Sequence, residues 1–541
     1  MRRQACHPDV ILLAGRCHTL CAHPRTVQAL AVAGGRIVAL GTRRSVLLLR
    51  GRGTRVLDLG RAAITPGLTD CHTHFLYWAL GRALVIDLST APSLDAALAA
   101  IRAGAARKRV GEWVVARGFD HNRWGCGFPR AADLDRAVPH RPAIAYSRDG
   151  HSAWLNTRAM KRFMLTGHTA DPKGGRFLRD AHGALTGIVQ EAAIDQLADP
   201  LRDLARRNDP RAMRTIARAL DDACRNAWSF GITAVHILDD GASLFHMTRR
   251  WAEQRRGLRS VHAVSLADLP HATQLGLCSG FGDDWLRLGG VKIFADGALG
   301  SQTAYMFTPY PHRGRYCGVP VVAGQELKEV VCDAARRGWA AWIHAIGDRA
   351  VHDAVGAIGA ARRVEPRPLA HRIEHAQCVR PADVRRMARA RIIASVQPCH
   401  ILGDIAIADR HWPQARRNAY PLRALLDAGI VLAAGSDVPV ESIDPRRSLH
   451  AATMRTDEGG APAGGWFPRQ RITTHDALRA FTVGAARAAG LPAPAGTLAP
   501  GAPADLTVWE QDPLAAPPEA LLEVGILGCL VNGQPHLAGD A

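Results

Sequence analysis

The sequence predicts an α/β fold, a (β/α)8 TIM-like barrel with a small β-sandwich domain built from both termini and an insertion after the first barrel strand. Two observations support the barrel. From about residue 210 onward, short apolar stretches alternate with amphipathic helical stretches, as parallel strands covered by helices do. With the apolar stretch before His72, these strands number eight, which closes such a barrel. A doubly wound open sheet is the alternative, but no glycine-rich phosphate loop accompanies it.

Length and composition indicate a large globular protein. With 541 residues the chain exceeds one ordinary hydrophobic core, and its 47% apolar and 22% charged residues are typical of soluble domains. The sequence has no apolar run of about 18 residues, which a transmembrane helix needs, and no clear secretion signal. We therefore expect a cytoplasmic protein.

The net charge of +19 raises the question of a nucleic-acid partner. The positive residues are nearly all arginines, spread along the chain and mixed with Asp and Glu, so a solvated arginine-rich surface explains them better. Twelve cysteines are scattered without a CxxC pair, which predicts free thiols and no zinc knot. The expected partner is a small-molecule substrate, with no nucleic acid and no membrane. The expected assembly is a homodimer.

Both ends of the chain have the pattern of short strands. We expect residues 1–61 and 490–541 to form the β-sandwich domain together. A hairpin is predicted around the Gly-Gly turn at residues 34–35, and another around the Asn-Gly turn at residues 532–533. The two ends of the chain therefore meet in one small domain.

Residues 62–489 are expected to form the barrel, with residues 80–215 as an α+β insertion. In the insertion, helices are predicted over 94–108 and 188–206. Two of the helices between barrel strands are predicted at 325–338 and 381–390. After the strand that precedes His72, the predicted barrel strands are 231–236, 260–264, 290–294, 340–344, 372–375, 392–396 and 430–434.

Metal-capable and ionisable residues stand at the ends of these strands. His72 and His74 lie one residue apart, so on a strand their side chains point to the same face, as two imidazoles holding one metal ion must. Such a pair alone also occurs as two unrelated histidines. The other strand ends favour a metal site, because the chemistry of such barrels gathers at the C-terminal strand ends. The further residues are Lys292, His344, His375 and Asp437.

These residue types fit hydrolytic chemistry. Neutral imidazoles and a carboxylate suit zinc and similar ions, which lower the pKa of bound water towards neutrality. Asp437 can take a proton from that water and pass it to a leaving amine. The ammonium group of Lys292 would repel a metal ion. It is therefore a charge partner, a structural residue or a chemically altered residue, such as a carbamate that bridges two metals.

Further motifs surround these positions. They are Pro66-Gly67 with the two histidines, residues 292–301, residues 344–350, Arg372-Ile373-Glu374-His375, Gly435-Ser436-Asp437, residues 148–156 and 187–191 of the insertion, and residues 496–506 near the C-terminus. In these segments the chain resembles the amidohydrolase superfamily, most nearly its YtcJ-like branch (amidohydrolase family 3), which includes N-substituted formamide deformylase. The resemblance covers nearly the whole chain.

The resemblance implies a role for each ligand position. His72 and His74 would hold the more buried metal with Asp437, and His344 and His375 would hold the second. Lys292, as an N6-carboxylated lysine, would bridge two zinc or similar divalent ions. The reaction would be hydrolysis of a carbon–nitrogen bond, usually an amide, by metal-activated hydroxide with Asp437 as general acid and base.

Several other residues have two interpretations. Asp149 and His151 of the insertion, and Asp296 after the lysine strand, are candidate substrate-binding residues, although Asp149 and His151 fit a structural turn equally well. Asp348 either orients His344 or caps the next helix, which is slightly favoured. His236 is expected to be structural. Core packing is likewise the favoured role of Trp113, Trp124 and Phe128, which could alternatively line a pocket.

Two rival functions remain open at this point. In a mononuclear, deaminase-like hydrolase, one metal is held by His72, His74, His344 and Asp437, and Lys292 is unmodified. A non-catalytic scaffold of the same fold would be expected to have lost ligands, and none is lost here. Metal stoichiometry distinguishes the first rival from the binuclear hypothesis.

Overall fold

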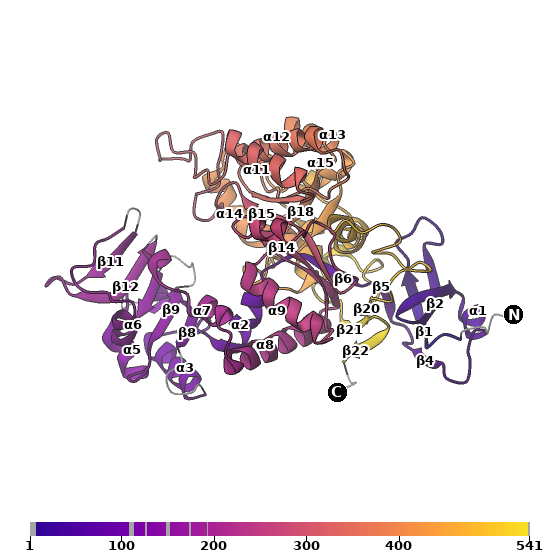
Figure 1. Cartoon of the computed structure of the whole chain (residues 1–541), viewed down its shortest axis with the longest axis horizontal. Helices are drawn as coiled ribbons and strands as arrows, with labels where there is room; N and C mark the ends of the chain where they lie inside the picture. Colours follow the sequence, from indigo (N-terminus) through magenta and orange to yellow (C-terminus); the bar gives the residue numbers. More distant parts are fainter. Residues whose placement is uncertain are drawn as a thin grey trace. The chain divides into compact units, whose positions relative to one another are not determined.

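The computed structural model describes residues 7–107, 113–124, 127–147, 152–172, 175–191 and 193–538. It confirms the α/β barrel (Figure 1). The chain divides into two compact units. One unit contains Met1–Leu76 and Asp221–Ala541, and the other contains Tyr77–Leu220.

Eight parallel strands form the barrel, and they follow the chain order β6-β13-β14-β15-β16-β17-β18-β19 around the sheet. The seven stretches predicted as barrel strands from residue 231 onward each contribute a strand, and the first barrel strand is the one that contains His72. Their bounds are β6 Leu68–Thr73, β13 Ile232–Ile237, β14 Arg259–Ser265, β15 Leu286–Phe294, β16 Ala341–Ala345, β17 Arg372–His375, β18 Ile393–Val396 and β19 Leu432–Ala434.

The barrel closes between its first strand and the segment after its last strand. His74 N donates to Val438 O at 2.8 Å, and Asp437 N donates to His72 O at 2.8 Å. The buried carboxylate of Asp70 strengthens this seam, since it accepts hydrogen bonds from the amide and the hydroxyl of Ser436. The closing seam therefore brings His72 and Asp437 to the same end of the barrel.

Helices cover the strands, and many of them are amphipathic, with apolar residues facing the barrel. The neighbouring helices α11, α12 and α13 can be followed together in Figure 1. The helices of this part are α8 Pro210–Ser229, α9 Gly241–Ala252, α10 Leu269–Gln274, α11 Gly324–Arg336, α12 Asp348–Val364, α13 Pro381–Arg389, α14 Ile401–His411, α15 Leu422–Asp427, α16 Pro445–Met454, α17 Thr474–Arg479 and α18 Ala485–Ala488.

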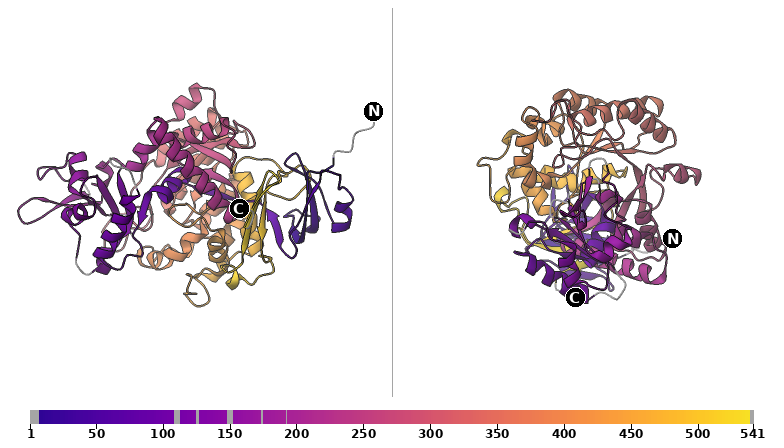
Figure 2. Two further views of the ribbon diagram at one scale, coloured as in Figure 1. Left: turned by 90° about the horizontal axis from the view of Figure 1, so that it is seen from below. Right: turned by 90° about the vertical axis from the view of Figure 1, so that its left-hand side faces the viewer.

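Strands from both chain ends share one mixed sheet in the order β22-β21-β20-β5-β1-β2-β3, with β4 paired to β1. Figure 2 shows the C-terminal strands in yellow beside the N-terminal strands in indigo. Both predicted hairpin turns have two residues with positive φ, as type I′ turns require. The bounds are β1 Val10–His18, β2 Thr26–Ala33, β3 Arg36–Gly41, α1 Arg43–Leu47, β4 Arg55–Asp58, β5 Ala63–Pro66, β20 Leu506–Trp509, β21 Ile526–Val531 and β22 Gln534–Leu537.

The passage from this sheet to the barrel differs from the boundary drawn at residue 62. Ala63–Pro66 pairs with β20 and β1, so it belongs to the terminal sheet, and the chain enters the barrel at Gly67. A Cβ atom at Gly67 would lie 2.3 Å from Oγ1 of Thr233, which explains why a glycine stands here. The apolar character of β5 alone could not show which sheet it joins.

The unit Tyr77–Leu220 contains a six-stranded sheet in the order β11-β12-β10-β9-β8-β7. The predicted helix over 188–206 is wrong, because β12 covers its first part and a separate helix begins at Pro200, capped by Asp199. Trp124 and Phe128 pack on the apolar core of this unit, as expected. The bounds are α2 Phe75–Leu84, β7 Val85–Asp87, α3 Leu94–Ala106, β8 Val114–Phe119, α4 His121–Trp124, α5 Ala131–Ala137, β9 Ala143–Ser147, β10 Ser152–Leu155, α6 Thr157–Arg162, β11 Gly175–Arg179, β12 Leu185–Glu191 and α7 Pro200–Arg206.

Of the helices within the described ranges, none has both the length and the apolar character that a membrane span requires.

Candidate metal centre

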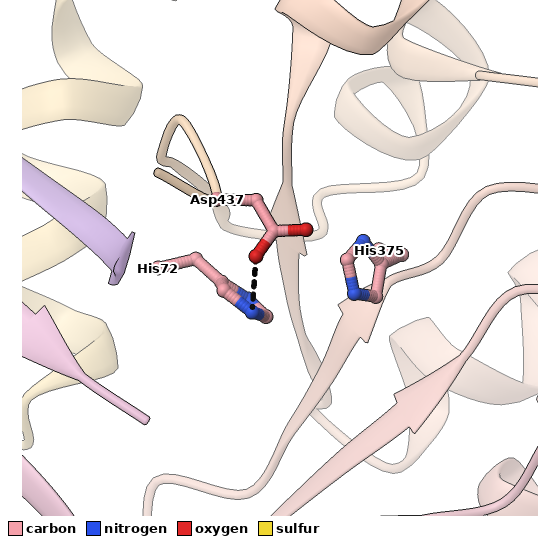
Figure 3. Close-up of side chains that lie close together, drawn as sticks. All are labelled: His72, His375 and Asp437. Atoms are coloured by element: carbon pink, nitrogen blue, oxygen red, sulfur yellow. Dashed lines mark ion pairs between the residues drawn. The ribbon is translucent and has the colours of Figure 1, made fainter. Parts of the chain in front are cut away.

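Three of the predicted ligands form a buried cluster at the C-terminal end of the barrel. His72 comes from β6, His375 ends β17, and Asp437 follows β19. One potential ligand atom from each lies within 4.8 Å of the others, and all three side chains are buried (Figure 3). The three elements are far apart in sequence and meet only because the barrel closes.

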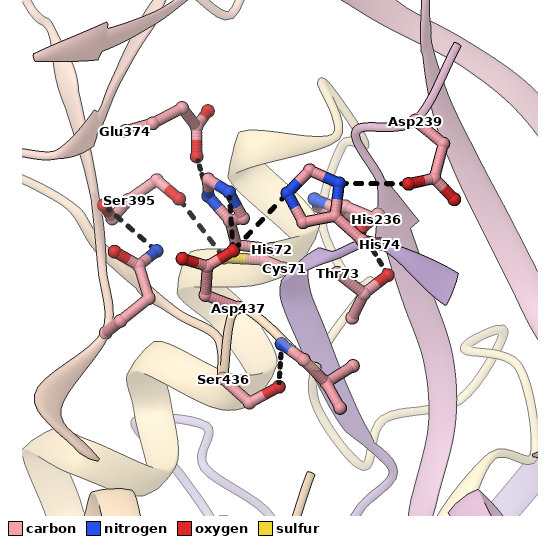
Figure 4. A network of polar contacts seen from close by, with 12 residues as sticks. Cys71, His72, Thr73, His74, His236, Asp239, Glu374, Ser395, Ser436 and Asp437 are labelled. Atoms are coloured by element: carbon pink, nitrogen blue, oxygen red, sulfur yellow. Dashed lines mark hydrogen bonds and ion pairs between the residues drawn. The ribbon is translucent and has the colours of Figure 1, made fainter. Parts of the chain in front are cut away.

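His74 joins this cluster through the same carboxylate oxygen. The Nε2 atoms of His72 and His74 lie 3.4 and 3.5 Å from Oδ1 of Asp437 (Figure 4). The opposite ring nitrogen of each histidine faces another carboxylate, because His72 Nδ1 lies 2.7 Å from Glu374 and His74 Nδ1 lies 2.9 Å from Asp239. An ionised carboxylate only accepts hydrogen bonds, so each Nδ1 carries a proton, and in the neutral ring the lone pair of Nε2 faces Oδ1.

This arrangement fits a cation between the three atoms. The Nε2 atoms of both histidines converge on one buried carboxylate oxygen, and Oδ1 has no hydrogen-bond partner among the described residues. Two ligand atoms of one tetrahedral zinc ion lie about 3.4 Å apart, given metal–ligand bonds of about 2.0–2.2 Å. The observed separations match that value. The donor set therefore suits a divalent metal of the zinc type.

The backbone at this end of the barrel is strained at the ligands themselves. His375 and Asp437 have φ angles of 68° and 61°, in the left-handed region that residues with a Cβ atom seldom occupy. Strain of this kind is retained where the surrounding structure enforces it, often at functional sites. At β17 it also has a geometric effect, because it breaks the alternation of the strand and lets Glu374 and His375 both approach His72.

Two further predicted ligands line the same rim. The ring of His344, near the end of β16, lies 4.6 Å from the ring of His375. Its Nε2 lies 3.0 Å from the carbonyl oxygen of Gly297, so Nε2 carries the proton and Nδ1 keeps a lone pair. Lys292 is buried on β15, and its Nζ forms no hydrogen bond or ion pair with any described residue. It lies 4.8 Å from the ring of Phe294.

Burial and neighbouring charges shift the pKa values of these groups in different directions. Burial lowers the pKa of His72 to about 4, with a further lowering from the charge of Lys292. Burial also acts on His74, but the carboxylates of Asp239 and Asp437 outweigh it and raise its pKa to about 9. Burial lowers the pKa of Lys292 to about 8. His72 is thus a neutral imidazole, and the space between His74 and Asp437 attracts a positive charge.

A second layer of buried residues supports the histidines, and of these only His236 had a predicted role. Arg372 is fully buried and donates to Glu374, to the backbone of Cys71 and to Nδ1 of His236. Its guanidinium group also stacks on the ring of Trp342, at 3.4 Å from the centroid. His236 is therefore structural, as expected. In the sequence, Glu374 could have been noticed because it stands next to a histidine at a strand end. Asp239 could have been noticed because two acidic residues stand together shortly after a strand.

Of the predicted substrate-binding residues, only Asp296 lies in the described part of the chain. Asp149 and His151 lie outside the described residues. Asp296 is buried, and its oxygens accept hydrogen bonds from the backbone amides of Tyr305, Ile346 and Gly347. It holds the loops around His344, and a contact with substrate stays a prediction. Asp348 is the first residue of α12, but Gly347 occupies the capping position and no side-chain cap hydrogen bond is present, so the favoured capping role is wrong. The carboxylate of Asp348 instead accepts a hydrogen bond from Phe307 N.

One histidine that sequence reasoning missed also faces the cluster. His400 follows β18 in the short helix η2 Pro398–His400, and its Nε2 lies 3.7 Å from Oδ2 of Asp437. Its ring is 6.0 Å from that of His375. The sequence analysis had placed no polar residue at the end of this strand. The signal for it was a histidine three residues beyond Gln397, where the strand has already ended.

Comparisons with known proteins agree with the fold and identify the family. The sequence profile of a family described as the amidohydrolase family matches residues 55–536. The chain is 30% identical to the protein LONG AFTER FAR-RED 3 of Arabidopsis thaliana, over 92% of this chain and 87% of that protein. It is 27% identical to the N-substituted formamide deformylase of Arthrobacter pascens, over 97% of each. A solved structure, an uncharacterized metal-dependent hydrolase from Pyrococcus furiosus, is similar with a TM-score of 0.79 and 25% identity, covering 93% of this chain and 99% of that chain.

Proposed function

Because the chain belongs to the amidohydrolase family, we propose that it is a metal-dependent hydrolase that cleaves an amide-type carbon–nitrogen bond of a small substrate. The observation that carries this proposal is the buried Oδ1 of Asp437, which faces the Nε2 atoms of two histidines and has no hydrogen-bond partner among the described residues. A bound divalent ion satisfies all three groups at once.

We assign the ligands to two ions, with zinc as the metal that this donor set suits best. His72, His74 and Asp437 would hold one ion, and His344 and His375 would hold the other. Lys292 would be a shared ligand as a carbamate, which forms when a neutral amine adds CO2 and releases a proton. The support is the burial of Lys292 without an ion pair, which is costly for an ammonium group and is relieved by conversion to an anionic ligand.

When bound, such ions polarise the substrate carbonyl and lower the pKa of water, so that hydroxide is available near neutral pH. The residues of the chain supply the rest. Asp437 keeps Oδ1 on the metal side, and Oδ2 is free to take the proton from the attacking water. It then delivers that proton to the leaving nitrogen as the C–N bond breaks, and returns to the carboxylate form. Glu374 and Asp239 keep His72 and His74 in the tautomer that this arrangement needs.

A mononuclear, deaminase-like hydrolase is the second candidate. The observation in its favour is that His72, His375 and Asp437 form a single tight group among the described residues, which one ion can fill. In that case Lys292 stays an unmodified amine. One ion per chain, with no response to bicarbonate, supports this candidate, whereas two ions support the first.

The test combines metal analysis with a substrate panel. Protein purified without chelators is analysed for metals and assayed for amine release from N-formyl and N-acyl amines. We expect two divalent ions per chain and release of amine. Asp437→Asn should lose at least about 100-fold in kcat/KM, and the exposed control Asp427→Asn should lose nothing. Failure of the metal-loaded wild type on every amide of the panel overturns amide hydrolysis, and absence of metal binding overturns the whole proposal.

A further inference from the structure

His400 occupies a place in the site that none of the predicted ligands fills. It follows β18, and its side chain is 12% exposed. Its Nε2 atom is buried and has no hydrogen-bond partner among the described residues. A buried polar atom without a partner costs about 1–3 kcal/mol, so such atoms are rare in stable proteins. The missing partner of Nε2 is therefore expected to be a bound molecule.

A missing hydrogen-bond partner indicates a substrate-binding atom only where that atom also faces the candidate site. Nε2 of His371 also has no partner, but His371 precedes β17 and lies at the opposite, N-terminal end of the barrel strands. His400 differs because its Nε2 is 3.7 Å from Oδ2 of Asp437. That distance is too long for a hydrogen bond, and a third group that lies beside both atoms can contact each of them.

The two oxygens of Asp437 face different neighbours. Oδ1 lies against Nε2 of His72 and Nε2 of His74, on the side proposed for the metal. Oδ2 faces His400. Proton delivery to the leaving nitrogen must come from the oxygen that is not held by the metal. The leaving nitrogen must therefore come within hydrogen-bond distance of Oδ2, and this places it beside His400.

We propose that His400 is a catalytic residue that contacts the leaving-group nitrogen of the substrate. Its Nε2 accepts a hydrogen bond from the N–H of a secondary amide. This contact turns the nitrogen lone pair of the tetrahedral species towards Oδ2 of Asp437. The proton passes from Oδ2 to nitrogen, the C–N bond breaks, and His400 itself neither gains nor loses a proton. The inference rests on the proposed amide hydrolysis and assigns its substrate class as amides that retain an N–H.

The experiment crosses two substrates with two variants. Formanilide and N-methylformanilide share the acyl group and the ring, and only the first has an N–H. His400→Phe keeps a planar ring without the acceptor, and His400→Gln restores an amide oxygen that can accept. The matched control is His371→Asn, which changes the other buried histidine whose Nε2 lacks a partner. Metal content is measured for every variant, because a ligand role for His400 would reduce it.

We expect the wild type to prefer formanilide by at least about tenfold in kcat/KM, since a site built to bind an N–H rejects the analogue that lacks it. His400→Phe should lose about 10- to 100-fold on formanilide and less than about threefold on N-methylformanilide, with unchanged metal content. His400→Gln should recover part of the loss. Any loss in His371→Asn should be equal on the two substrates, so that this control keeps the wild-type preference. Equal losses on both substrates, or loss of metal from His400→Phe, overturn the inference. If the metal-loaded wild type hydrolyses neither of these two formanilides nor any other amide, the proposed function is wrong.

Discussion

His72 Nδ1 lies 2.7 Å from Oε2 of Glu374, and both side chains are fully buried. This contact gives His72 the tautomer whose Nε2 lone pair points at Asp437. Replacement of Glu374 by Gln removes the negative charge that holds the ring and makes the imidazole a weaker ligand. We expect Glu374→Gln to lower metal affinity about 10- to 100-fold, measured by competition with a metal-binding dye. The exposed control Glu326→Gln should keep the wild-type affinity. Equal affinities for all three proteins would contradict the role given to Glu374.

Arg372 is the counter-charge of Glu374, so its removal should affect stability. Arg372→Met leaves a buried carboxylate without its charge partner, and the expected loss is about 3–5 kcal/mol in the free energy of unfolding. The measurement is the urea midpoint, with Arg385→Met on the surface of α13 as control. The double variant with Glu374→Gln should lose less than the sum of the single losses, because both members of the pair are then uncharged. Strict additivity would show that the pair is not coupled.

Much of the fold and of the candidate site could be predicted from the sequence because strand ends in a barrel converge. The strands that end near His72, His344 and His375 were recognisable as continuous apolar runs between helices. What could not be predicted was how neighbouring residues turn. On a regular strand Glu374 and His375 face opposite sides, and only the left-handed φ of His375 lets both approach His72.

Local turns and pairing partners also explain the other differences between the prediction and the structure. His400 lies beyond the end of its strand, in a turn of η2 whose direction no periodicity reveals. The stretch 188–206 has helical composition, but Pro200 has no backbone N–H and begins a new helix, while the residues before it pair in a sheet. Ala63–Pro66 is apolar in either sheet, and only its pairing partners decide between them.

His371 should make the stability of the protein depend on pH. Burial, with a further contribution from the charge of Arg362, lowers its pKa from about 6.5 to about 3. Between these values the unfolded chain binds the proton and the folded chain does not, so this contribution to stability is present above about pH 6.5 and is lost as the pH falls. The effect is on the order of 3 kcal/mol at pH 4.

The test of this prediction uses His371→Asn, whose side-chain oxygen can still accept the hydrogen bond from Ala341 N. We expect the urea midpoint of the wild type to fall more steeply than that of the variant between pH 6.5 and 4, and the two slopes to agree above pH 7. Parallel curves over the whole range would show that His371 is not responsible.

Lys292 distinguishes the binuclear from the mononuclear hypothesis. If its amine is carboxylated, wild-type protein should carry the mass of one CO2 in native mass spectrometry and should bind two ions in bicarbonate. Burial lowers the pKa of Lys292 to about 8, which makes the neutral, CO2-reactive amine accessible near physiological pH. Lys292→Met should hold at most one ion, lose activity and no longer respond to bicarbonate, whereas the exposed control Lys328→Met should behave like the wild type. If Lys292→Met keeps two ions and full activity, the lysine is no ligand, and its buried charge must be balanced by the carboxylates of Asp437 and Glu374. An unmodified lysine that serves as a charge partner would give a third result, namely one ion in both proteins with reduced activity only in the variant.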